Sequence, residues 1–131
     1  MISEIIADFE ANKNRIKGKL SEVHPSDYTQ LVLWVFGCIG ATGNDNWLRA
    51  KPDLDRIMVI NNGGYQGNQL FIAPERNGDG FYLVCVGYGS CSGCDTLEGI
   101  RKYQEGRPTI QQTEDYMTLC LHIAQKIIYV N

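Results

Sequence analysis

Three short apolar segments separated by turn-forming clusters limit what this chain can fold into. Strands are predicted over residues 56–60, 69–73 and 81–87. The first two flank residues 61–67, which are rich in asparagine and glycine, and the sequence Asn77-Gly78-Asp79-Gly80 precedes the third. Asparagine, aspartate and glycine adopt the backbone angles of tight turns, so the three segments are expected to pair as an antiparallel meander.

The third of these strands is apolar on both of its faces. Its alternating positions carry two apolar sets, which are Phe81, Leu83 and Cys85 on one face and Tyr82, Val84 and Val86 on the other. A strand with one face in water normally has polar residues on that face. This strand is therefore predicted to be central in the sheet, or to lie between helices.

Apolar residues at helical spacing predict two helices before the strands. The first is predicted to end at His24-Pro25, and its apolar stripe consists of Ile2, Ile5, Ile6, Phe9, Ile16, Leu20 and Val23. Asp27 followed by Gln30 resembles a capping box. This signal favours a second helix, rather than a buried strand, over the apolar residues 31–36.

Two further helices are predicted after the strands. Asp95 with Glu98 starts a short helix, which ends at Gly106 and Pro108. The stripe of the last helix consists of Tyr116, Met117, Cys120, Ile123, Ala124, Ile127 and Val130. Residues 1–131 are therefore expected to form one globular domain of the α+β class, in which helices cover a small three-stranded antiparallel sheet in the order α-α-β-β-β-α-α.

Composition argues against several classes of protein. Twelve basic and fifteen acidic residues give a formal charge of -3, which does not suit a protein that binds the phosphate backbone of a nucleic acid. The start of the chain lacks the pattern of a secretory signal. The longest apolar run, residues 31–39, is shorter than the roughly 20 residues of a membrane span. A cytosolic protein is expected, with its five cysteines mostly reduced.

The run Tyr88-Gly89-Ser90-Cys91-Ser92-Gly93-Cys94-Asp95-Thr96 carries the strongest functional signal. Cys91 and Cys94 have the C-x-x-C spacing of zinc sites and of redox dithiols. A structural zinc site lacks two further ligands, because Cys120 and His122 point in different directions on a helix. A thioredoxin-like dithiol would follow the first strand of a βαβ unit, which this run does not. A tight structural loop is the third alternative.

A fourth alternative uses the backbone of the same run. Its successive N–H groups, the N-terminus of the following helix and the hydroxyls of Ser90, Ser92 and Thr96 suit a phosphate or a carboxylate. Asp95 opposes a strongly anionic ligand unless its charge serves as the helix cap.

A glycine-rich segment between the first two strands is the second candidate. Gly63-Gly64-Tyr65-Gln66-Gly67 either brings an aromatic ring and an amide to a ligand or forms a wide hairpin or bulge. In an antiparallel meander this turn and the exit of the third strand lie at the same end of the sheet. The predicted ligand-binding residues are therefore Tyr65, Gln66, Tyr88, Ser90, Cys91, Ser92, Gly93, Cys94, Asp95 and Thr96.

Three segments carry a resemblance to a known group of proteins. They are residues 64–72, residues 86–97 with the sequence YGSCSGCDTL, and residues 115–119 together with His122. In these segments the chain resembles small uncharacterised proteins encoded by tailed bacteriophages and prophages. The resemblance implies an accessory rather than a virion role in the cytoplasm of a bacterial host. It implies no particular activity and no catalytic residues.

Two classes of function follow from these observations. The first is a phage-encoded accessory binding protein that captures a host factor or a small polar or anionic ligand, such as a nucleotide-like signal, and that can thereby inhibit a host defence. It is favoured because no catalytic constellation is recognisable. The alternative is a thiol-redox or metal-binding protein that uses Cys91 and Cys94. No cofactor, resident metal, nucleic-acid partner or membrane partner is expected, and the sequence is compatible with a homo-oligomer.

Overall fold

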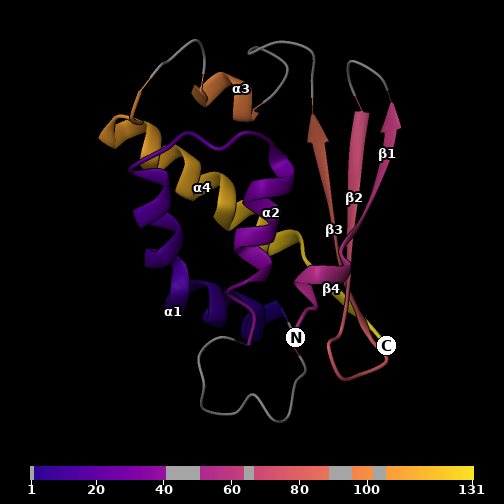
Figure 1. Ribbon diagram of the computed structural model, residues 1–131. Helices are drawn as coiled ribbons and strands as arrows, with labels where there is room; N and C mark the ends of the chain where they lie inside the picture. The colour runs from indigo at the N-terminus through magenta and orange to yellow at the C-terminus, as the bar shows by residue number, and fades with distance from the viewer. Residues whose placement is uncertain (1, 41–50, 64–66, 89–95, 102–105) are drawn as a thin grey trace.

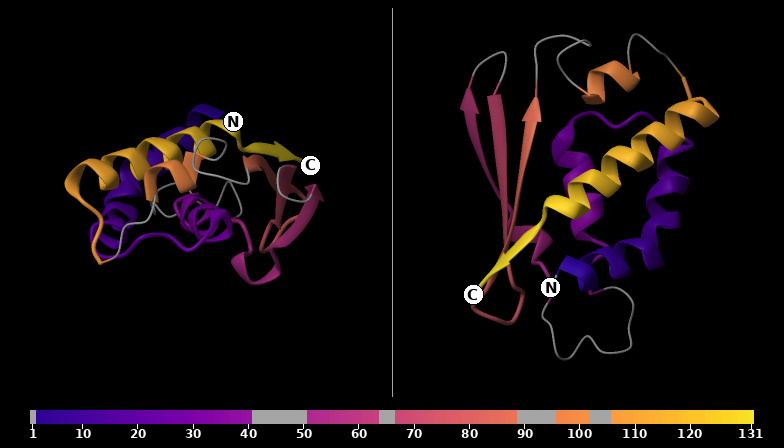
Figure 2. Two further views of the ribbon diagram at one scale, coloured as in Figure 1. Left: turned by 90° about the horizontal axis from the view of Figure 1, so that it is seen from above. Right: turned by 180° about the vertical axis from the view of Figure 1, so that it is seen from behind.

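A four-stranded antiparallel sheet carries a layer of helices on one of its two faces (Figure 1, Figure 2). The computed structural model describes residues 2–40, 51–63, 67–88, 96–101 and 106–131. Within these ranges the elements follow the order of two helices, a short 3-10 helix, three strands, two helices and a fourth strand. The chain therefore has an α+β fold, as the sequence predicts.

The first three strands form the predicted meander. β1 (Met58–Gly63) pairs antiparallel with β2 (Gly67–Pro74), and β2 pairs antiparallel with β3 (Phe81–Tyr88). β4 (Ile128–Val130) pairs with the free side of β3. β3 thus lies between two other strands, so the prediction that it is central is confirmed.

The fourth strand corrects two predictions, the three-stranded sheet and the extent of the last helix. The predicted helix reaches Val130, but α4 (Ile110–Lys126) ends earlier. Ile127 leaves it in an extended conformation, with φ -67° and ψ 130°, and Val130 then lies opposite Phe81 in the β3–β4 ladder. The sequence Ile-Ile-Tyr-Val is rich in β-branched and aromatic residues, which suit a pleated, half-buried surface better than a helix.

α1 (Ile2–Leu20) forms where the sequence predicts the first helix. It buries much of the predicted stripe, including Ile5 and Phe9. The helix ends before His24-Pro25, so Val23 lies beyond it and is 52% exposed. In the described ranges, no helix has both the length and the apolar character needed to cross a membrane.

α2 (Tyr28–Phe36) confirms the choice of helix over strand for the apolar run. The side chain of Asp27 caps the helix by accepting a hydrogen bond from the backbone N–H of Gln30 at 3.1 Å. The side-chain oxygen of Gln30 accepts from the backbone N–H of Ser26 at 2.9 Å, one residue earlier than in a regular capping box. The predicted capping pair therefore sets the start of this helix.

The two remaining helices are short. η2 (Leu54–Arg56) precedes β1, and α3 (Thr96–Arg101) lies between β3 and α4. The side-chain amide of Gln112 donates to the backbone oxygen of Ile100 at 3.0 Å, so the end of α3 is attached to α4. Residues 41–50, which lie between α2 and η2, are outside the described residues.

The core lies between the helix layer and the inner face of the sheet, the face that carries Tyr82, Val84 and Val86. α4 crosses the helix layer and contacts both α1 and α2 (Figure 2). Tyr116 and Ile123 of α4 are buried in this layer. The inner face of the sheet and the apolar stripes of the helices therefore share one core.

The opposite face of the sheet, called the outer face below, is also apolar. Residues opposite each other in a ladder share a face, so the register aligns Met58, Ile72, Leu83 and Ile128 in one row across all four strands. The helices of the described residues lie on the other side of the sheet (Figure 2). The apolar residues of the outer face are Met58, Ile60, Leu70, Ile72, Phe81, Leu83, Cys85, Ile128 and Val130.

Candidate functional site

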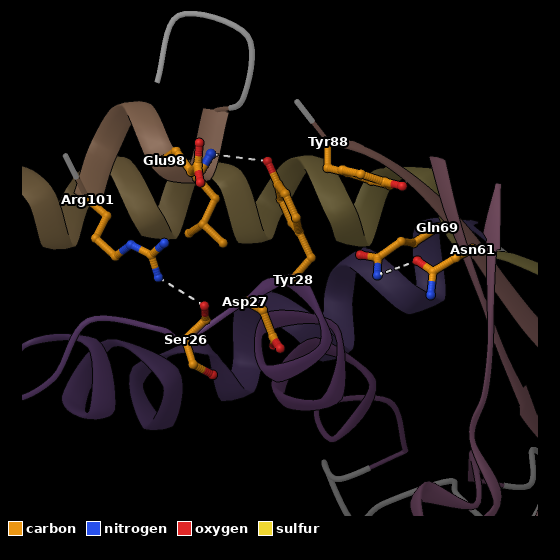
Figure 3. Close-up of a pocket in the computed structure, with 9 residues that line it drawn as sticks. Ser26, Asp27, Tyr28, Asn61, Gln69, Tyr88, Glu98 and Arg101 are labelled. Carbon is orange, nitrogen blue, oxygen red and sulfur yellow. Dashed lines mark hydrogen bonds between the residues drawn. The ribbon is translucent and has the colours of Figure 1, made fainter. Parts of the chain in front are cut away.

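A cavity of about 280 Å³ lies where one end of the sheet meets α3 and the start of α2 (Figure 3). Its wall combines the segment that leads into α2, three neighbouring strands and α3. The lining residues are Ser26, Asp27, Tyr28, Asn61, Gln69, Tyr88, Leu97, Glu98 and Arg101.

Tyr28 connects the start of α2 to α3. Its side chain is buried, and its hydroxyl accepts a hydrogen bond from the backbone N–H of Leu97 at 3.1 Å. That N–H lies in the first turn of α3, where backbone donors have no partner within the helix. Figure 3 shows the Tyr28 side chain between two groups of residues. Glu98 and Arg101 of α3 lie on one side of it, and the strand residues Asn61 and Gln69 lie on the other. The lining therefore has a charged part and an amide part.

Arg101 supplies the positive charge of the charged part. Its Nη1 donates to the backbone oxygens of Pro25 at 3.2 Å and of Ser26 at 2.9 Å, so it also fixes the segment that leads into α2. Asp27 and Glu98 bring two carboxylates to the same lining. The acidic groups in the lining therefore outnumber the basic one.

Two side-chain amides form the other part. Asn61 of β1 and Gln69 of β2 are direct partners in the ladder, and Gln69 Nε2 donates to Asn61 Oδ1 at 2.8 Å. Within the described part of the chain, this bond leaves Gln69 Oε1 as an acceptor and Asn61 Nδ2 as a donor for a ligand. Tyr88 of β3 also lines the cavity on this side (Figure 3). A donor, an acceptor and an aromatic ring are therefore grouped at the end of the sheet.

The lining offers hydrogen-bonding groups and an aromatic ring, and among the described residues it contains no cysteine or histidine. In the described ranges, no group of three or more His, Cys, Asp or Glu side chains is placed to hold a metal ion. Burial raises the pKa of Cys38 to about 11 and that of Cys120 to about 12, so both thiols are protonated at neutral pH. The lining residues can bind a polar molecule through hydrogen bonds and ring contacts.

Two of the predicted ligand-binding residues can be placed. Tyr88 lines the cavity, whereas Thr96 is exposed at the first position of α3 and is not part of the lining. The other predicted residues lie outside the described ones, and they are Tyr65, Gln66, Ser90, Cys91, Ser92, Gly93, Cys94 and Asp95. Their role in binding, and the alternative of thiol or metal chemistry at the C-x-x-C pair, stay predictions.

The strand register agrees with the expectation that the glycine-rich turn and the exit of the third strand lie at the same end of the sheet. Gly63 lies opposite Gly67, and Gly67 lies opposite Tyr88. The described neighbours of both predicted segments therefore lie at one end of the sheet. The cavity lies at the same end, because Asn61 and Gln69 are close to these glycines in β1 and β2.

Sequence reasoning missed most of the lining. Asn61 and Gln69 are unremarkable strand residues, and only their position beside the glycine-rich turn distinguishes them. Arg101 carries no local signal, because its carbonyl partners lie 75 and 76 residues away in the chain. For Asp27 and Glu98, the sequence predicts only a role in helix capping.

Comparisons with known proteins give no match to this chain among protein-family models, curated proteins or solved structures. The resemblance to phage and prophage proteins therefore stays a prediction.

His24 lies beside the segment that Arg101 binds. Its Nδ1 is 2.7 Å from the hydroxyl of Tyr116 on α4, and the two rings meet edge to face with centroids 5.8 Å apart. Nε2 is buried, and no partner for it lies in the described residues. Burial, followed by the positive charge of Arg101, lowers the pKa of His24. Protonation of this ring is therefore less favourable in the folded chain than in the unfolded one.

The free energy of unfolding is expected to decrease as the pH falls below about 6.5, the ordinary pKa of histidine. Above that pH, His24 is neutral in both states and contributes no pH dependence. Below it, the unfolded chain takes up the proton more readily, so stability is lost until the lower pKa of the folded state is reached. Urea unfolding at a series of pH values from about 7.5 to about 5.5 measures the slope of the unfolding free energy against pH.

The second histidine of the chain provides the control for this measurement. His24→Gln should remove most of the slope, whereas His122→Gln, at an exposed position on α4, should retain it. An unchanged slope in His24→Gln would show that other groups cause the pH dependence.

Proposed function

We propose that this protein is a phage-encoded accessory binding protein that captures a nucleoside-sized polar ligand in the cavity between the sheet and α3. The observation that carries the proposal is the convergence of hydrogen-bonding side chains from several segments on one cavity of about 280 Å³. Small-molecule sites enclose roughly 300–1,000 Å³. The cavity lies just below this range, which supports a small ligand.

The amide part of the lining supports recognition of a planar, polar ring. Within the described residues, Gln69 Oε1 remains as an acceptor and Asn61 Nδ2 remains as a donor, beyond the bond that joins the two amides. Side-chain amides pair with the donor and acceptor edges of nucleobases, and aromatic rings stack on their faces. Tyr88 supplies such a ring in the same lining.

The charges of the lining support a ligand without phosphate groups. Glu98 brings a carboxylate to the lining that would oppose an added anion, whereas the charge of Asp27 serves as the cap of α2. Arg101 already donates to two backbone carbonyls. Of the polar and anionic ligands that the sequence suggests, the lining favours the polar one.

The resemblance to phage and prophage proteins supports the setting of this proposal, the cytoplasm of a bacterial host. A protein that binds a small signalling molecule lowers its free concentration by mass action. Capture of a nucleoside-like signal is thus a direct physical route by which a binding protein inhibits a host defence.

Isothermal titration calorimetry with adenosine, guanosine, cytidine and uridine, and with their 5′-monophosphates, tests the proposal. We expect one nucleoside to bind, and to bind more tightly than its monophosphate. Gln69→Ala should weaken this binding roughly two- to tenfold, because losing a hydrogen bond costs about 0.5–1.5 kcal/mol.

Asn68→Ala is the matched control, because Asn68 is exposed on the outer face of the same strand and should not affect the affinity. No binding of any nucleoside at millimolar concentration would refute the proposal. Tighter binding of a monophosphate would refute the argument from charge.

A further inference from the structure

The outer face of the sheet is apolar, and the helices of the described residues lie on the opposite side of the sheet (Figure 1). Five of its side chains are strongly exposed, with Met58 at 56%, Ile128 at 51%, Ile60 at 47%, Val130 at 45% and Phe81 at 44%. An antiparallel sheet that packs helices on one face normally carries polar residues on the other. The exposed apolar side chains on β1, β3 and β4 depart from that pattern. Exposed apolar faces of this kind are typical of surfaces that bind another protein.

The area of this face approaches that of a stable interface. With about 150–250 Å² for a fully exposed large side chain, the five exposed fractions correspond to about 360–600 Å² of apolar surface. The partly exposed Leu70, Ile72 and Leu83 and the exposed Cys85 add to this area. The largest apolar patches on monomers cover about 300–600 Å². Two such faces in contact would bury about 700–1,200 Å² from the five side chains alone, and standard specific interfaces begin at about 1,200 Å².

The outer face also lacks charge. In the described part of the chain, its remaining positions are Asn62, Asn68, Pro74 and Gly87, which are neutral residue types. A neutral face offers no electrostatic complement to a charged protein or a nucleic acid. It does not repel an identical face, however, and interfaces between identical subunits are more apolar than other protein interfaces. The chemistry of this face therefore suits a second copy of the chain.

We infer that two copies of this protein pair through their outer faces, related by a twofold axis. In this arrangement the same patch is used by both subunits, as twofold symmetry requires. The two sheets would stack face to face at about 10 Å, the usual distance between packed sheets. The cavities face away from this contact, because their lining belongs to the inner side of each sheet.

Sedimentation velocity across the micromolar range tests the inference. The wild-type chain should approach twice its mass of 14.7 kDa as its concentration rises. Ile60→Lys places a charge in the outer face and should keep the protein monomeric. Ile110→Lys makes the same change at a side chain that is 86% exposed at the start of α4, and it should dimerise like the wild type.

Alkylation of Cys85 gives a second measurement that needs no substitution. Cys85 is an exposed free thiol on the outer face, opposite Leu70 in the ladder. Its labelling rate, followed by mass spectrometry of its peptide, should fall several-fold over the concentrations at which the mass doubles. A wild-type chain that stays at the monomer mass with constant labelling overturns the inference, as does a folded Ile60→Lys variant that still dimerises.

Discussion

Ile123→Ala is expected to lower the free energy of unfolding by about 2–5 kcal/mol, the usual range for truncating a buried isoleucine. Ile123 is 2% exposed on the side of α4 that meets the core. Truncation removes its apolar contacts and leaves a cavity that the neighbouring helices can fill only by moving. Urea unfolding at a fixed protein concentration, followed by circular dichroism, measures the change.

Ile110→Ala is the matched control on the same helix. The chemical change is identical, but Ile110 is 86% exposed, so we expect a change below about 0.5 kcal/mol. An effect of Ile123→Ala as small as that of Ile110→Ala would mean that the stripe of α4 is not in the core.

Gly80→Ala is expected to lower the free energy of unfolding by about 1–3 kcal/mol, the range for overpacking. A Cβ at Gly80 would collide with the carboxylate of Glu75 and with the hydroxyl of Tyr129. Glu75 is buried, and the ring of Tyr129 packs against Tyr82 with centroids 5.1 Å apart, so neither side chain can move away without losing contacts. The same urea experiment gives the value.

Gly18→Ala provides the opposite result as a control. A Cβ there meets nothing within 4 Å, and alanine is the better helix former by about 0.5–1 kcal/mol. This variant in α1 should therefore be more stable than the wild type. Wild-type stability in Gly80→Ala would show that the turn between β2 and β3 is less tightly packed than the structure indicates.

The sheet was predictable to the extent that its pairing is local. Asparagine, aspartate and glycine lie between β2 and β3, and a glycine-rich segment lies between β1 and β2, so the antiparallel meander follows from local sequence. Asn61 and Asn62, which the sequence places in the first turn, are part of β1. β4 was missed because Ile127 and Val130 happen to continue the helical spacing of the α4 stripe. Only pairing with the distant β3 distinguishes a strand from a helix there, and no local pattern contains that information.

The candidate site was predictable in position but not in composition. The described neighbours of the turn after β1 and of the exit of β3 lie at the same end of the sheet as the cavity, and Tyr88 is among the lining residues. Whether the predicted residues bind a ligand stays a prediction. The charged part of the lining depends on contacts between distant segments, such as those from Arg101 to the residues before α2. Such contacts arise from packing, which spacing within one segment cannot reveal.

The late position of β4 in the chain has a consequence for the order of folding. The pairs within β1, β2 and β3 join residues close in sequence, whereas Phe81 pairs with Val130 across two intervening helices. Closing a longer loop costs more chain entropy, and distant pairs slow folding. The meander can therefore assemble from local contacts, while the edge of β3 obtains its last hydrogen bonds only when α4 has brought the end of the chain back to the sheet.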